Sequence, residues 1–161
     1  MAIEAPISRF KKTNLKIYIA GCAAAAIIFA YDGYLSKYKW SGRYNFYKEQ
    51  VLDNDGKPTP TMNFNRISPP IFLAGAVLLA VYLFEIKDKK LIADENELII
   101  SNKKRISYDS VRQIDKTYFE KKGFFVITYE DKEGSEIKRK LSNRTYDNLA
   151  AVLDHLVEKI S

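Results

Sequence analysis

Side chains able to carry out chemistry are sparse in this sequence. It contains one histidine, His155, and one cysteine, Cys22. Metal sites need several His, Cys or carboxylate ligands at short spacing, and His155 has no second His or Cys close to it in the sequence. A nucleophilic triad needs a His and a nucleophile on a sharp Gly-rich turn, and no such motif is present. We therefore expect no enzyme activity, no metal and no cofactor, and a structural or solvent-facing role for His155.

Two carboxylates stand at the ends of apolar stretches. Asp32 follows the first stretch and Glu85 closes the second. Ionisable groups inside a membrane often belong to proton relays. Because both positions fall at the expected membrane interface, we favour ordinary capping, or pairing with Lys37 or Lys89.

Basic side chains form two short clusters in the second half of the chain. Lys103, Lys104 and Arg105 make the first cluster, and Lys121 and Lys122 make the second. Basic loops beside a membrane can contact anionic lipid head groups, whereas a solvated hairpin tip is the plainer interpretation. The chain has a net charge of +6, but the excess lies mostly beside the apolar stretches. This distribution argues for membrane contact and against nucleic-acid binding.

The apolar stretches predict two transmembrane helices, over 17–35 and 70–86. A basic leader, 1–16, precedes the first helix, and a mixed loop, 36–69, joins the two, with a short amphipathic helix expected within 37–52. Cys22 stands in a sequence like a lipoprotein processing box, and the leader also resembles a cleaved signal peptide. The apolar run before Cys22 is short and no clear cleavage site follows, so an uncleaved helix is our interpretation.

Lys and Arg beside the two helices predict their orientation. Seven lie close to the helices on the two outer flanks, before the first helix and after the second, against three close to the helices in the loop, Lys37, Lys39 and Arg66. By the positive-inside rule, both termini are expected in the cytoplasm, with two spans in a bacterial-type inner membrane.

Small residues on both helices allow close backbone approach at small-xxx-small spacing. They are Ala20, Gly21, Ala24 and Ala25 on the first helix, and Gly75, Ala76 and Ala80 on the second. We expect them to pack the helices on each other or to receive a partner, either another integral membrane protein or a second copy of the chain.

Residues 87–161 have the pattern of a small α+β domain. Alternating and β-branched runs predict strands near 98–100, 105–108, 111–114, 123–129 and 136–141, with a turn at 130–135 and a bend or bulge within 111–114. Thr145 is expected to cap a final helix, with Asp147 in its first turn. The helix has one apolar stripe, formed by Leu149, Val152, Leu153, Leu156 and Ile160.

The order of these elements, with Ile106-Ser107-Tyr108-Asp109-Ser110-Val111-Arg112-Gln113-Ile114 leading into a strand pair and a terminal helix, resembles bacterial membrane-attached pleckstrin-homology-like (PH-like) domains. The resemblance covers 90–161, which is shorter than a seven-stranded domain, so an edge strand is expected to be missing or abbreviated. It implies a binding or scaffolding module. We expect a non-enzymatic accessory or scaffold subunit of a larger membrane complex; the alternative is a module that senses anionic lipid.

Overall fold

The computed structural model describes residues 2–101 and 103–160, a mixture of long helices and antiparallel sheets. The chain forms two compact units. One unit, here called the head domain, contains the residues up to 14 and those from 84 onward, and the other, here called the helical unit, contains 15–83. The long helices α1 (Arg9–Ala30) and α3 (Pro60–Ile86) each begin in one unit and end in the other.

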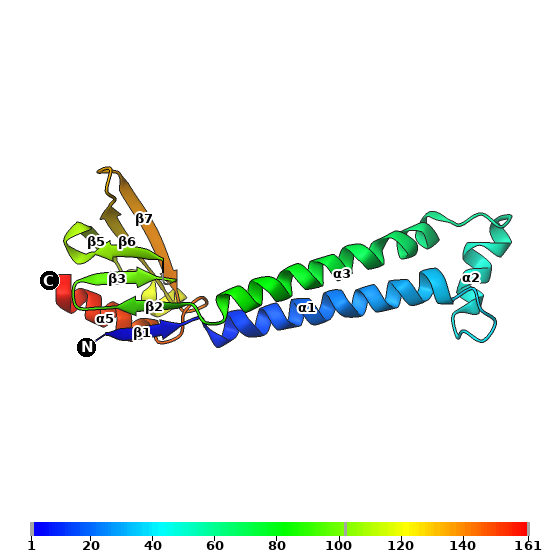
Figure 1. The fold of residues 1–161 in the computed structure, drawn as a ribbon, viewed down its shortest axis with the longest axis horizontal. Coiled ribbons are helices and arrows are strands. Elements are labelled where there is room, and N and C mark those ends of the chain that lie inside the picture. The colour runs from blue at the N-terminus through cyan, green and yellow to red at the C-terminus, as the bar shows by residue number, and fades with distance from the viewer. Residues whose placement is uncertain (1, 102, 161) are drawn as a thin grey trace. The chain divides into compact units, whose positions relative to one another are not determined.

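The head domain contains a four-stranded and a three-stranded antiparallel sheet (Figure 1). In the first sheet the order is β1 (Ile3–Pro6), β2 (Lys90–Ala93), β3 (Glu97–Ile100) and β4 (Lys104–Ser107). The second contains β5 (Val111–Asp115), β6 (Phe124–Glu130) and β7 (Glu136–Ser142), with α4 (Phe119–Lys122) between β5 and β6. The predicted strands are all present, and the expected bulge lies between Val111 and Gln113. Helix α5 (Leu149–Ile160) ends the described chain.

Strand β1, which the sequence analysis assigned to a basic leader, belongs to the first sheet. It pairs antiparallel with β2, with Ile3 opposite Ala93 and Pro6 opposite Lys90. Its Ala5 has no exposed surface. Lys90 also forms an ion pair with Glu4 at 2.5 Å. A strand that precedes the first long helix therefore completes a sheet whose other strands follow the second.

The start of α1 is held by residues near the C-terminal end. Ser8 caps α1, because its Oγ accepts a hydrogen bond from the Lys11 amide at 3.1 Å. The same Oγ donates to the Arg144 carbonyl at 2.5 Å. Asp147 accepts from the Arg9 amide at 3.0 Å, so its negative charge lies at the N-terminus of α1. The helix therefore begins at Arg9, eight positions before the predicted start at 17.

Helix α5 begins later than predicted. Its first residue is Leu149, preceded by Asn148 in the left-handed region at φ 59°. Thr145 therefore does not cap this helix, and Asp147 serves α1 instead of the first turn of α5. The predicted apolar stripe does face the core, where Leu149, Val152, Leu153 and Leu156 are buried. The largest fully buried head-domain side chains are Leu91, Leu98, Ile106, Phe125, Ile127 and Leu141, together with Leu149, Val152 and Leu156 of α5.

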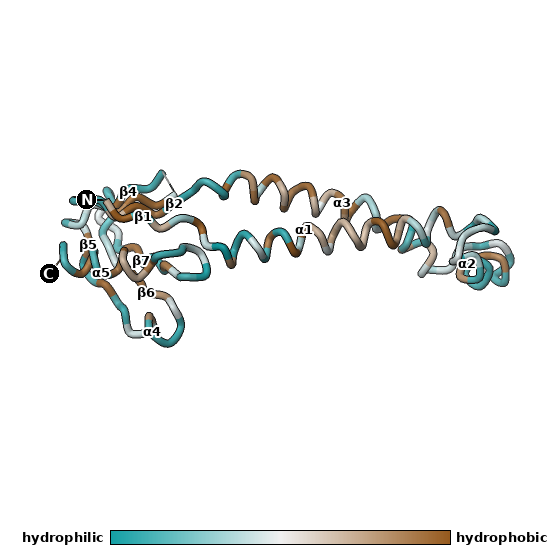
Figure 2. The backbone as a smooth tube through the Cα atoms, turned by 90° about the horizontal axis from the view of Figure 1, so that it is seen from below, coloured by the Kyte–Doolittle hydropathy of each residue, from teal (hydrophilic) through white to brown (hydrophobic). Residues whose placement is uncertain are grey.

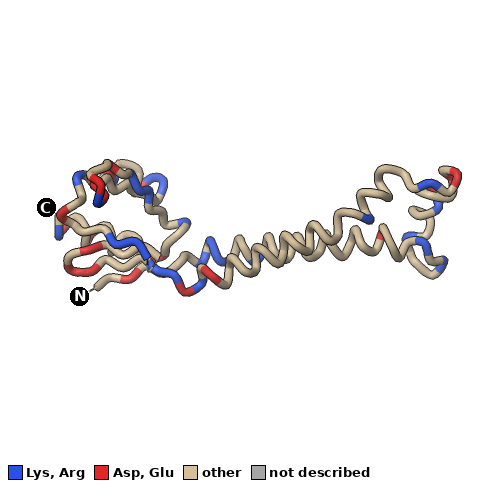
Figure 3. The backbone as a smooth tube through the Cα atoms, turned by 45° about the horizontal axis from the view of Figure 1, so that its top comes forward, with Lys and Arg blue, Asp and Glu red and all other residues tan. Residues whose placement is uncertain are grey.

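The helical unit contains most of α1, a π-helical turn (Tyr31–Leu35), α2 (Tyr44–Gln50), a 3-10 turn (Leu52–Asn54) and most of α3. Figures 2 and 3 show the middle of α1 and of α3 as apolar and free of charged residues. Arg9–Leu35 and Pro60–Ile86 are long and apolar enough to cross a membrane. The buried and half-buried positions of α1 and the π-helical turn include a series with alternating spacings of four and three, a 3.5-residue period typical of packed helix pairs. The members of the series are Leu15, Ile19, Cys22, Ala26, Phe29 and Gly33.

Contacts between α1 and α3 are clearest around two aromatic pairs. The ring of Phe29 lies 5.3 Å from that of Phe64, edge to face, and 5.5 Å from that of Phe72, stacked. Both geometries are favourable for aromatic side chains. The second long helix begins ten residues before the predicted start at 70, so Pro69 and Pro70 lie inside it.

The π-helical turn after α1 supplies a donor to one of the two carbonyls that the prolines of α3 leave unpaired. Proline lacks an N–H, so Pro69 and Pro70 cannot donate to the carbonyls of Asn65 and Arg66. The Tyr34 hydroxyl donates to the Arg66 carbonyl instead, at 2.6 Å. The Arg66 Nε in turn donates to the Gly33 carbonyl at 3.2 Å. A π-helical turn re-aims its side chains by one position, and here it brings Tyr34 to this carbonyl.

Candidate functional site

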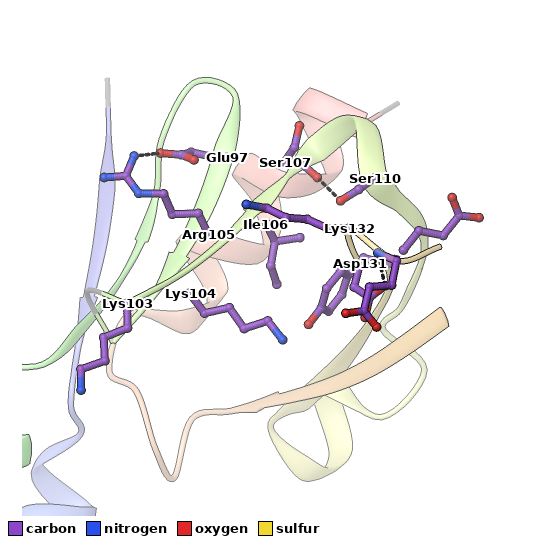
Figure 4. Close-up of a pocket in the computed structure, with 12 residues that line it drawn as sticks. Glu97, Lys103, Lys104, Arg105, Ile106, Ser107, Ser110, Asp131 and Lys132 are labelled. Atoms are coloured by element: carbon purple, nitrogen blue, oxygen red, sulfur yellow. Dashed lines mark hydrogen bonds and ion pairs between the residues drawn. The ribbon is translucent and has the colours of Figure 1, made fainter. Parts of the chain in front are cut away.

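An open groove of about 740 Å³ runs between β4 and the end of β6 with the β6–β7 turn (Figure 4). Both walls belong to the head domain. Its lining residues are Glu97, Lys103, Lys104, Arg105, Ile106, Ser107, Ser110, Tyr129, Glu130, Asp131, Lys132 and Glu133. The predicted basic cluster Lys103, Lys104 and Arg105 thus lines one wall, and Figure 4 shows Lys104 extending from β4 across the opening.

Strand β4 is the outer strand of its sheet in the described part of the chain. Its register with β3 puts Glu97 opposite Ser107 and Ile99 opposite Arg105. The Tyr108 amide donates to the Asn96 carbonyl, which identifies Asn96 and Tyr108 as a hydrogen-bonded pair of the antiparallel ladder. Hydrogen-bonded and non-bonded pairs alternate in antiparallel sheets, so the backbone groups of Arg105 and Ser107 point away from β3. The Ser107 carbonyl accepts from Ser110 Oγ at 2.7 Å. The edge thus offers the amides of Arg105 and Ser107 and the Arg105 carbonyl.

Tyr129 is a residue of the groove that sequence reasoning missed. It lies on the same face of β6 as the buried Phe125 and Ile127, and it is 3% exposed. Its hydroxyl is buried and has no hydrogen-bond partner within the described structure. The Lys104 ammonium lies 5.2 Å from the ring centroid, a cation–π distance. Lys104 shares the inner face of β4 with Ile106, so a cation takes a position that a core side chain would otherwise fill.

The two walls of the groove carry an opposite excess of charge, since Glu97 accompanies three cations on one wall and Lys132 accompanies three carboxylates on the other. Arg105 forms an ion pair with Glu97 at 2.8 Å, which leaves Lys103, just before β4, and Lys104 without a carboxylate partner among the described residues. On the other wall, Glu130 makes two hydrogen bonds with Arg112, at 3.0 and 2.7 Å. The Arg112 guanidinium lowers the pKa of Glu130 below its ordinary value. Asp131 accepts from the amides of Glu133 and Ser135, both at 2.9 Å, and so fixes the turn.

The second predicted basic cluster lies outside the groove. Lys121 and Lys122 end α4, and the Lys122 ammonium lies 4.7 Å from the ring centroid of Tyr118. Tyr118 stacks on Phe124 at 5.5 Å, and the Lys140 ammonium lies 3.7 Å from the Phe124 ring. Two stacked rings with a cation at each end therefore form a row that runs from α4 to β6 and β7. We call Lys122, Tyr118, Phe124 and Lys140 the cation–ring row.

The predicted small residues differ in their surroundings. Ala76 is buried, whereas Ala20, Gly21, Ala24 and Ala80 are exposed and Ala25 and Gly75 are half-buried. A Cβ added at Gly21 or at Gly75 would meet no atom within 4 Å. A Cβ at Gly33, in contrast, would lie 2.6 Å from the Asn65 carbonyl oxygen. The close approach of α1 to α3 therefore depends on Gly33, which sequence reasoning missed because it follows the charged Asp32.

Asp32 pairs with Arg43 and not with Lys37. Its two carboxylate oxygens accept from Arg43 Nε at 2.8 Å and from an Arg43 Nη at 2.9 Å. Arg43 lies in the loop that leads into α2, and only a rigid guanidinium matches both oxygens in this way. Asp32 thus ties the loop to the end of α1.

His155 is a buried residue of α5 that donates from Nε2 to the Asp94 carbonyl at 3.0 Å. The Tyr108 hydroxyl donates to the same carbonyl at 2.8 Å. Burial, followed by the charges of Asp94 and Glu97, raises the pKa of Tyr108 to about 12. Both side chains therefore fasten α5 and the β4–β5 corner to the β2–β3 turn.

The comparisons with known proteins return no relative. No protein-family model matches this sequence, and neither a curated protein nor a solved structure matches it significantly. The function must therefore be argued from the sites themselves.

Proposed function

We propose that this chain is a non-enzymatic scaffold or accessory subunit, anchored in a bacterial-type inner membrane by a hairpin of two transmembrane helices. Its head domain, which we propose to be PH-like, presents a binding surface on the cytoplasmic side to a larger membrane assembly. Other integral membrane proteins, or further copies of the chain, would be its partners within the membrane.

The pairing of β1 with β2 is the observation that carries this proposal. The chain leaves the head domain in α1 and returns to it in α3, and β1 and β2 then lie in one sheet. If both helices cross a membrane, the two flanks must meet on the same face of it, which supports the two-span topology. The excess of Lys and Arg on these flanks favours the cytoplasmic face.

The strand count supports the PH-like assignment. The sequence pattern predicts five strands, with an edge strand of a seven-stranded domain missing or abbreviated. The observed strands β1 and β2 bring the described count to seven. Sheets of four and three antiparallel strands followed by one amphipathic helix agree with the resemblance over 90–161. We therefore propose a PH-like domain interrupted by a membrane hairpin.

Aromatic side chains in the loop support a membrane boundary there. Trp40 is 71% exposed and stacks on Tyr38 with ring centroids 5.6 Å apart. Tyr34 is also exposed. Trp and Tyr concentrate at membrane–water interfaces, where one end of the ring is apolar and the other is wet.

Native co-purification from membranes in mild detergent tests the scaffold role. We expect stoichiometric partner proteins to accompany the wild-type chain, and fewer to accompany a variant with charge reversals at Lys103 and Lys104. Charge reversals at Lys48 and Lys57, which lie in the loop, serve as the matched control. A wild-type chain recovered as a lone monodisperse monomer would contradict the scaffold role.

The cation–ring row favours the alternative, sensing of anionic lipid. Tyr118 is 45% exposed between Lys122 and Lys140. Each basic residue near an anionic membrane surface contributes about 1 kcal/mol to the attraction between the protein and that surface. Full-length chain in nanodiscs with and without anionic lipid separates the two roles. Salt-sensitive protection of residues 116–124 from hydrogen exchange in anionic discs alone would favour lipid sensing.

A further inference from the structure

The free edge of β4 is the feature of the head domain best suited to receive another chain. Strands β2 and β3 are paired on both sides. At the opposite edge of this sheet, the chain itself hydrogen-bonds to the end of β1. The amides of Arg105 and Ser107 and the Arg105 carbonyl point into an open groove of about 740 Å³. Extended peptides often bind by adding a strand to such an edge.

The chemistry inside the groove calls for one negative charge. The buried Tyr129 hydroxyl lacks an acceptor, and Lys104 lies over its ring without a carboxylate partner among the described residues. A carboxylate placed between them would accept from the hydroxyl and pair with the ammonium. Charge-assisted hydrogen bonds of this kind are stronger than neutral ones.

We propose that an extended segment of a partner protein, carrying one acidic side chain, adds as a further strand to β4. Its backbone pairs with Arg105 and Ser107, and its carboxylate draws Lys104 off the ring and accepts from Tyr129. The proposal rests on the scaffold role given above and names the chemistry of the partner.

Charge favours this occupant over two others. A second copy pairing through the same edge would bring another β4, whose residues Lys104–Ser107 include no carboxylate to pair with Lys104 and Tyr129. An anionic membrane would meet Glu130, Asp131 and Glu133, which outnumber Lys132 on the other wall of the groove. A single carboxylate delivered along β4 avoids both difficulties.

The test uses the full chain in detergent micelles and three short acetylated peptides of alternating Thr and Val. The first peptide has one central Glu, the second has Gln at that position, and the third has the Glu and N-methylated alternate amides. We expect the Glu peptide to bind and to slow hydrogen exchange at Arg105 and Ser107. Loss of the charge-assisted bond should weaken the Gln peptide about tenfold. The N-methylated peptide should not bind, because it cannot pair with the edge.

Protein variants supply the second half of the test. Tyr129→Phe and Lys104→Met should each weaken the Glu peptide severalfold, whereas Lys121→Met, outside the groove, should not. Unliganded Tyr129→Phe should be as stable as the wild type or more so, because it removes a buried hydroxyl with no partner.

Absence of Glu-peptide binding, equal binding of the Glu and Gln peptides, or protection of Arg105 and Ser107 by anionic nanodiscs instead would overturn the proposal. Partners that still co-purify with the wild-type chain in that case would leave the scaffold role standing.

Discussion

Replacing Gly33 by Ala should destabilise the helical unit. A Cβ at this position would lie 2.6 Å from the carbonyl oxygen of Asn65, 2.8 Å from its carbonyl carbon and 3.1 Å from the Arg66 nitrogen. These are backbone atoms, so the helices must separate. Overpacking costs about 1–3 kcal/mol, weakening the two hydrogen bonds between Tyr34, Arg66 and Gly33 adds about 1 kcal/mol each, and the better helix propensity of Ala returns about 1 kcal/mol. The expected net loss is about 2–4 kcal/mol.

Gly21 and Gly75 provide matched controls within the same two helices. Added Cβ atoms there meet nothing within 4 Å, so Gly21→Ala and Gly75→Ala should stabilise the protein by about 0.5–1 kcal/mol through helix propensity alone. Stability is measured in dodecyl maltoside micelles by titration with sodium dodecyl sulfate, following helical circular dichroism and the fluorescence of Trp40, the one tryptophan. If Gly33→Ala proves as stable as these two variants, the result would contradict a close contact of Gly33 with the backbone of α3.

Three further changes test other parts of the structure. Ala5→Asp buries a charge in β1 and should remove hydrogen-exchange protection from β2 to β4, at a cost of several kcal/mol. Tyr34→Phe leaves the Arg66 carbonyl without its donor and should lower the stability of the helical unit by about 1–3 kcal/mol. Because Arg112 lowers the pKa of Glu130, this carboxylate stabilises the head domain at neutral pH and ceases to do so as the pH falls below its ordinary value of 4.5. The Glu130→Gln variant should therefore lose less stability than the wild type when the pH is lowered in acid-unfolding experiments.

Exposed residues of the same types serve as controls for these three changes. Ala2→Asp, Tyr38→Phe and Glu158→Gln should each leave stability nearly unchanged, because surface substitutions usually stay within about 0.5 kcal/mol. A head domain that tolerates Ala5→Asp as well as Ala2→Asp would refute the pairing of β1 with β2. Equal effects of Tyr34→Phe and Tyr38→Phe would refute the hydrogen bond to the Arg66 carbonyl. Equal effects of Glu130→Gln and Glu158→Gln would refute the stabilising ion pair with Arg112.

The strands of the head domain could be predicted because their patterns are local. Alternation and β-branched runs determine β3 to β7, and the stripe on α5 determines its buried face. Strand β1 was missed because its partner, β2, follows both long helices in the sequence. In addition, four residues ending in Pro6 resemble an ordinary leader. No local pattern reveals a pairing of such high sequence separation.

Helix ends and the groove were harder to predict for a related reason. Thr145 and Asp147 have the residue types of a helix cap, but tertiary contacts assign Asp147 to the start of α1. Pro69 and Pro70 suggest a helix start, yet Tyr34 and Gly33 allow α3 to continue through them. Lys104 could be found from its charge, whereas Tyr129 could be found only from the pairing of β6 with its neighbours.

Cysteine labelling in sealed membranes tests the proposed topology most directly. With Cys22 replaced by Ser, single cysteines are placed at Ala2 and Glu133 in the head domain and at Asp53 in the loop, all of them exposed. A membrane-impermeant maleimide should reach Ala2→Cys and Glu133→Cys from the same side, the cytoplasmic one, and Asp53→Cys only from the other. Labelling of Ala2→Cys and Glu133→Cys from opposite sides, or of all three from one side, would contradict a membrane hairpin whose two flanks build one domain.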